Sequence, residues 1–195
     1  MSSLAAGLLT AMPLAVLAHP GHEEASSFFQ GLAHPFSGVD HVLAMVMVGL
    51  LAVRSGGRAL WLLPAVFVAA MAVGSLAGPA AYVASAASSL EIGIALSVIV
   101  LGVLLALQVR LPLLGAALLV AAVALLHGNA HGVEAPGGVT LAYLGGFLSG
   151  TAALHLAGIL AGAGLARIAL RRSELLTRIA GVVGSGAGVF LLASI

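Results

Sequence analysis

The chain has 195 residues, of which 62% are apolar and only 7% are charged. Ordinary soluble domains are about 45–50% apolar, so this composition excludes a water-soluble fold and indicates burial in lipid. The formal net charge is +1 with no lysine, which argues against a nucleic-acid partner, and the absence of cysteine excludes disulfides, iron–sulfur clusters and thiolate metal sites.

Residues 1–18 form a separate, signal-like apolar segment. The stretch Leu4–Leu17 is short for a membrane span, and Val16 and Ala18 put small residues at the minus-three and minus-one positions of a signal-peptidase site. No arginine or lysine precedes the stretch, so a retained N-terminal apolar helix stays open beside a cleaved signal peptide. We expect residues 19–195 to form a single transmembrane domain.

Six further apolar runs follow in the chain. Each is long enough to cross a hydrocarbon layer of about 30 Å as a helix, and the short connections predict that consecutive helices are antiparallel neighbours. The sequence therefore predicts an all-α membrane protein, a bundle of six transmembrane helices in a lipid bilayer. The expected spans are Phe36–Val53, Leu60–Gly78, Leu90–Leu107, Leu111–Leu126, Val139–Leu165 and Leu175–Ala193.

The arginines predict the orientation. All seven fall on one side of the six-span arrangement, at Arg54, Arg58, Arg110, Arg167, Arg171, Arg172 and Arg178. Positively charged connections stay in the cytoplasm. In a bacterial inner membrane, the N-terminus of the mature chain, the connections Pro79–Ser89 and His127–Gly138 and the C-terminus would then face outward.

Most imidazole and carboxylate side chains gather on the outward side, the first group at the start of the first span. Pro35 is typical of a first helical position, which places His34 at the helix cap and Asp40 and His41 in the second turn. Imidazole with carboxylate suits divalent metals such as nickel, cobalt, zinc or iron. Asp40 would offset the repulsion between a cation and the helix N-terminus; alternatively it is hydrogen-bonded to amides of the first turn.

A second group, His127, His131 and Glu134, closes the fourth span. Histidines four residues apart share one face of a helix. The glycine after each histidine and a nearby proline predict an irregular backbone, which at membrane depth is tolerated where it lines a cavity or packs in protein. The group is a candidate metal or substrate site, and the alternative is a loop whose histidines hydrogen-bond backbone carbonyls.

Three other positions carry candidate ligands. Glu91 opens the third span and faces both groups. His155 lies roughly sixteen residues into the fifth span, about 24 Å along a regular helix. Ionisable groups at such depth are often functional, although a satisfied core histidine is an equal alternative. His19 and His22, ahead of the first span, are weaker candidates for metal binding.

Two segments resemble known motifs. Residues 34–41 are similar to the His-x5-Asp-His motif of the HupE/UreJ family, and residues 127–134 to its second motif, His-Gly-x-Ala-His-Gly-x-Glu. Leu126 stands where that family often has phenylalanine, and Glu91 also resembles the family pattern. The resemblance implies a nickel permease or facilitator that supplies hydrogenase or urease. Its functional residues would be His34, Asp40, His41, Glu91, His127, His131 and Glu134.

The residues by themselves predict an outward-facing site for a divalent metal, and nickel enters only through the resemblance. The leading hypothesis is uptake of Ni²⁺, Co²⁺ or another divalent ion as substrate, without a prosthetic group. The sequence has no P-loop ATPase motif, and none is required, because a divalent ion entering an inside-negative cell gains about 4.6 kcal/mol per 100 mV. A homo-oligomer stays open.

Two enzyme or redox functions compete with transport. One is an intramembrane zinc-dependent hydrolase, in which histidines and Asp40 hold zinc and an activated water beside Ser37. The other is a bis-histidine haem protein for electron transfer, which the carboxylates at the site argue against.

Overall fold

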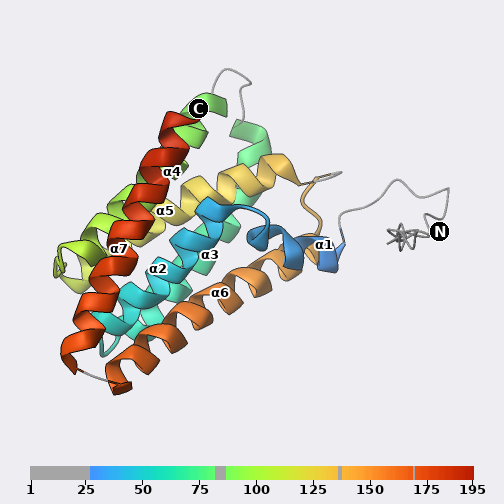
Figure 1. Cartoon of the computed structure of the whole chain (residues 1–195). Helices are drawn as coiled ribbons and strands as arrows, with labels where there is room; N and C mark the ends of the chain where they lie inside the picture. The colour runs from blue at the N-terminus through green and yellow to red at the C-terminus, as the bar shows by residue number, and fades with distance from the viewer. Residues whose placement is uncertain (1–26, 82–86, 136–137, 169) are drawn as a thin grey trace, which may run out of the picture.

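A computed structural model describes residues 27–81, 87–135, 138–168 and 170–195. The described chain is helical throughout and contains no strand, which confirms the all-α prediction. Its elements are α1 (Phe28–Ala33), the short 3-10 helix η1 (His34–Phe36), α2 (Val39–Ser55), α3 (Ala59–Ala81), α4 (Ala87–Ala106), α5 (Leu113–Glu134), α6 (Leu141–Ile168) and α7 (Leu170–Ala193) (Figure 1). The predicted signal-like segment 1–18, His19 and His22 lie outside the described residues.

Five of these helices, α3 to α7, are long and apolar enough to cross a membrane. The predicted first span is broken instead of straight: residues Phe28–Phe36 and Val39–Ser55 meet at an angle of 82°, and together they could make a sixth span. The break also corrects the expected cap. Pro35 lies inside η1, α2 begins only at Val39, and Asp40 is in its first turn.

Helix α2 is the centre of the bundle, since it contacts each of α3, α4, α5, α6 and α7. Its sequence is apolar on nearly every face, and most of its residues from His41 to Ala52 are buried. Gly56 ends the helix with φ +66°, a conformation that glycine adopts without strain. A helix that is apolar all round is expected at such a position, and its first turn is held among the ends of its neighbours.

Glycines decide which helices pack most closely. The most extensive contacts join α3 with α5, α4 with α7 and α2 with α6, whereas in the described residues the backbones of consecutive helices α3 and α4 do not approach closely, nor do those of α5 and α6. A Cβ on Gly128 or Gly132 of α5 would collide with the backbone of Met71 or Ser75 of α3. The prediction that consecutive helices are neighbours is therefore wrong for α3 and α4, because glycine faces let non-consecutive helices approach, while α5 and α6 meet through the side chains of His131 and Phe147.

The same contact corrects the predicted end of the fourth span. Helix α5 does not stop at Leu126 but continues through Glu134, so His127 and His131 are helical and not part of a loop. The glycines that predicted an irregular backbone are helical as well. They lie against α3, and this packing compensates for the low helix propensity of glycine.

The two ends of the bundle differ in chemistry. The turns between α2 and α3 and between α4 and α5, the end of α6 and the start of α7 gather at one end, on the left in Figure 1. There Arg54 donates from Nε to Oε1 of Gln108 at 3.0 Å, from Nη1 to the carbonyl of Val109 at 2.6 Å and from Nη2 to the carbonyl of Gln108. Arg54 thereby fastens the end of α2 to the α4–α5 connection.

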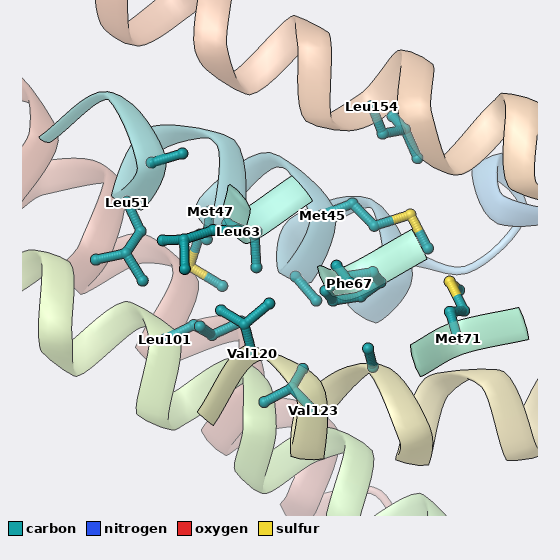
Figure 2. Close-up of a cluster of buried hydrophobic side chains, with 14 of the residues drawn as sticks. Met45, Met47, Leu51, Leu63, Phe67, Met71, Leu101, Val120, Val123 and Leu154 are labelled. Atoms are coloured by element: carbon teal, nitrogen blue, oxygen red, sulfur yellow. The ribbon is translucent and has the colours of Figure 1, made fainter. Parts of the chain in front are cut away.

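An apolar core separates this arginine end from the histidine end. Figure 2 shows Leu63 and Phe67 of α3 among side chains of α2, α4 and α5. Both side chains are fully buried, so the interior between the two ends is closed by hydrocarbon and thioether groups.

Candidate metal-binding site

Four histidine rings meet where the break before α2 lies over the last turns of α5. The ring centres of His41 and His131 are 4.1 Å apart, those of His41 and His127 are 4.8 Å apart, and those of His34 and His131 are 4.6 Å apart. His41, His127 and His131 are buried, and His34 is partly buried. The two predicted groups therefore form one cluster, which we call the histidine cluster: His34, His41, His127 and His131.

The carboxylate of Asp40 fixes the orientation of its neighbour His41. Oδ1 of Asp40 lies 2.6 Å from Nδ1 of the imidazole and 2.8 Å from the backbone N of the same residue. An ionised carboxylate only accepts, so Nδ1 carries the proton. Nε2 is then left with its lone pair free and has no hydrogen-bond partner. A carboxylate that holds a ligand histidine in this way is typical of metal sites.

Ser97 of α4 fixes the orientation of His127 as Asp40 does that of His41. The sequence alone did not identify Ser97 as a site residue. Its hydroxyl lies 2.7 Å from the carbonyl of Ile94 and 2.9 Å from Nε2 of His127. A hydroxyl has one proton. Because that proton goes to the carbonyl, the hydroxyl accepts from Nε2–H, and Nδ1 of His127 keeps a free lone pair. A single serine in an apolar helix gave no sign of which neighbour it faces.

Glu134, the last residue of α5, brings a side-chain carboxylate to the cluster. Its Oε2 lies 3.3 Å from Nε2 of His34 and 4.0 Å from Nδ1 of His131. One ligand atom from each of these three residues can be chosen so that all lie within 4.8 Å of one another. One ion could bridge three such atoms after a small adjustment.

Five nitrogens of the histidine cluster are buried and make no hydrogen bond, although the first of them lies 3.3 Å from Oε2 of Glu134: Nε2 of His34, Nε2 of His41, Nδ1 of His127, and both Nδ1 and Nε2 of His131. Buried polar atoms are normally paired, and an unpaired one costs roughly 1–3 kcal/mol. Each neutral ring has one lone-pair nitrogen, so four of these five atoms can be ligands, and a cation that accepts those lone pairs would explain why they are buried without partners.

An aromatic wall from α6 closes the cluster on one side. Ring centres are 4.4 Å apart between His131 and Phe147, and 5.8 Å apart between His34 and Tyr143. The hydroxyl of Tyr143 is also buried and unpaired. The i, i+4 spacing of these two aromatic residues was visible in the sequence, but nothing in it indicated that they face the histidines.

Glu91 does not touch the histidine cluster in the described structure; it lines the approach to it. A cavity of about 410 Å³ is bordered by Asp40, His41, Glu91 and Glu134, together with the C-terminal end of α7. Glu91 and Glu134 are exposed, and Asp40 is partly buried. Three carboxylates at its walls make this vestibule attractive to a divalent cation.

The remaining candidate, His155, is separate from the cluster and lies deeper in α6. It is 1% exposed, and neither ring nitrogen has a hydrogen-bond partner. Its ring is in edge contact with Phe67, with centres 4.7 Å apart.

The geometry bears on the two competing chemistries. Ser37, the expected partner of a zinc-bound water, is exposed and donates its hydroxyl to the carbonyl of His34 at 2.7 Å. The paired rings of the histidine cluster, at 4.1 to 4.8 Å, leave no room for a porphyrin between them. The arrangement favours a small ion held by several imidazoles.

Comparisons with known proteins extend over nearly the whole chain. The family model described as HupE / UreJ protein matches residues 7–191. The chain is 41% identical over 184 residues to Protein HupE of Rhizobium leguminosarum bv. viciae, an alignment that covers 93% of this chain and 92% of that relative. No solved structure matches it significantly.

Proposed function

Because the chain belongs to the HupE/UreJ family, we propose that it takes up a divalent transition-metal ion, Ni²⁺ first among the candidates, across the bacterial inner membrane. The observation that carries the proposal is the set of five buried imidazole nitrogens without partners. Neutral imidazole is a preferred ligand for nickel, zinc, copper and iron. The family association with nickel selects among these metals.

The first step is capture in the vestibule. Asp40, Glu91 and Glu134 give the cavity a negative potential, which raises the local concentration of cations. Glu134 then passes the ion from the vestibule to His34 and His131, because its Oε2 lies 3.3 Å from Nε2 of His34 and 4.0 Å from Nδ1 of His131.

The second step is binding in the histidine cluster. The hydrogen bonds from His41 to Asp40 and from His127 to Ser97 fix the tautomers, so that one free lone pair of each ring is available to the ion. These partners prearrange the ligands before an ion arrives, which lowers the entropic cost of binding.

Inward movement follows the membrane potential. The arginine end is cytoplasmic by the positive-inside rule, and the histidine cluster is then near the outer surface. The electrostatic free energy of a divalent ion falls by about 4.6 kcal/mol per 100 mV as it moves inward. The potential therefore supplies the driving force for uptake without an ATPase in this chain.

Initial uptake of radioactive nickel into proteoliposomes, at a fixed inside-negative potential, tests this function. The wild-type protein should take up nickel, and His131→Ala should abolish high-affinity uptake, because the His131 ring lies between those of His34 and His41 and neither of its nitrogens has another partner. Thr177→Ala is a matched control at the other end of the bundle, since its hydroxyl only donates to the carbonyl of Ser173. Wild-type uptake no faster than in empty liposomes would refute the proposal.

A further inference from the structure

His155 has no role in the function proposed so far, although its side chain is as buried as those of the histidine cluster. It is 1% exposed and neither ring nitrogen makes a hydrogen bond of normal geometry, although the backbone of Thr151, one turn earlier, is close enough to interact with the ring. The apolar groove of about 530 Å³ that it borders between α3 and α6 is lined otherwise by apolar residues. That groove supplies no hydrogen-bond partner either. An imidazole in a membrane interior is costly to leave unpaired.

The depth of His155 follows from the packing of α6 on α2. A Cβ on Gly49 would collide with the carbonyl of His155. Gly49 lies eight residues after His41 on α2, which is about 12 Å along a helix axis. The backbone of His155 is therefore farther from the vestibule than His41 is, on the way to the arginine end.

The ring of Phe67 stands between the two sites. Its centre is 6.2 Å from that of His127 and 4.7 Å from that of His155. Phe67 is fully buried. No other described aromatic ring contacts both histidines, so this side chain is the only aromatic partition between them.

Sulfur atoms, which are soft metal ligands, lie near Phe67. Figure 2 shows the thioethers of Met45 and Met71 near Phe67, from helices α2 and α3. The hydroxyl of Thr151, one turn before His155 on α6, lies 3.5 Å from Sδ of Met71. Thr151, Met45 and Met71 are fully buried. A column of imidazole, thioether and hydroxyl groups thus leads from the cluster into the bundle.

We propose that His155 is a second ion-binding station on the inward path, which receives a partly dehydrated divalent transition-metal ion from the histidine cluster when the ring of Phe67 moves aside. This inference rests on the proposed uptake function and adds the position of the next ligand. Ligand exchange from one neutral imidazole to another involves no net bond change in the protein. The second station lowers the cost of carrying charge through the apolar core.

The first test separates binding from passage. His155→Leu should keep the affinity of the outer site for nickel and reduce initial uptake by at least about tenfold, since loss of even the hydrogen-bond partner of a ligand typically costs about 10- to 100-fold. Bound nickel at saturation should fall from two ions to one. If His155→Leu takes up nickel at the wild-type rate, the inference is wrong and the proposed function still stands. If the wild-type protein takes up no nickel, the proposed function itself is wrong.

The second test does not depend on transport or on the folding of the leucine variant. Because the chain has no cysteine, His155→Cys carries a single thiol. Nickel should slow its modification by methyl methanethiosulfonate in the purified protein. Leu154→Cys is the matched control on the same helix, 6% exposed in the wild type, and its modification should not respond to nickel. Equal rates with and without nickel for His155→Cys would overturn the inference.

Discussion

Asp40 and His41 are adjacent in the chain and joined by their side chains, with 2.6 Å between Oδ1 and Nδ1. The bond holds the imidazole beside the rings of His127 and His131, whose centres lie 4.8 and 4.1 Å away. The carboxylate thus acts on an ion through the histidine that it orients, in addition to its charge at the vestibule.

This relationship predicts a graded effect at position 40. Asp40→Asn keeps an oxygen that accepts from Nδ1–H and loses only the charge, so nickel affinity should fall modestly. Asp40→Ala loses the acceptor as well, and affinity should fall about 10- to 100-fold. Calorimetric titration of the purified variants measures both. An equal loss in the two would show that charge or direct ligation, and not orientation, is the role of Asp40.

Ser97 should prove as important as Asp40, although no motif includes it. Ser97→Ala removes the acceptor that holds the proton of His127 on Nε2, and nickel affinity should fall about tenfold. Ser97→Thr keeps the hydroxyl and should retain most of the affinity. Ser149→Ala is the control, because that exposed hydroxyl only donates to the carbonyl of Gly145. Unchanged affinity in Ser97→Ala would show that the tautomer is set in another way.

Uptake should decline as the external medium becomes acidic. Free imidazole has a pKa of about 6.5, and a protonated imidazole cannot ligate a metal ion. Protons therefore compete with nickel at each ring of the histidine cluster, and lower pH favours the protons. With several rings required, the decline should be steeper than a single titration. Uptake that stays constant between about pH 5 and 8 at fixed potential would contradict this role for the histidines.

The orientation can be tested with single cysteines in this cysteine-free chain. Ser55, at the end of α2, and Ser194, beside the vestibule, are both exposed. A thiol reagent that does not cross membranes should label Ser194→Cys in intact spheroplasts and Ser55→Cys only after the membrane is opened. The reverse pattern would mean that the vestibule faces the cytoplasm. The proposal that ions enter from outside through the vestibule would then be wrong.

The contact between α3 and α5 should be sensitive to a single methyl group. Gly128→Ala places a Cβ against the backbone of Met71, and the helices must separate beside His127. The midpoint of thermal unfolding and nickel affinity should both fall. Gly164→Ala is the control, because its Cβ would meet nothing within 4 Å and alanine favours a helix by about 1 kcal/mol over glycine. If Gly128→Ala unfolds at the same midpoint temperature as the wild type, the helix pair tolerates wider spacing.

The sequence by itself determined the class of the protein and the residue types of its site. Apolar runs of membrane length predict spanning helices because an unpaired backbone is too costly in lipid, and the described chain is helical. The two motifs predicted that residues 34–41 and 127–134 would form one site. They are brought together because both lie at the same end of antiparallel elements.

Only the tertiary structure decided the contacts between helices. Spans of uniform hydrophobicity contain little information about which face meets which neighbour, so the sequence could not pair Ser97 with His127 or place Phe67 between two histidines. Glycine patterns indicated close packing but not the partner, and they were misread as irregular backbone near His131. Helix packing in lipid depends on local shape rather than on an apolar face hidden from water, and shape is a property of the assembled bundle.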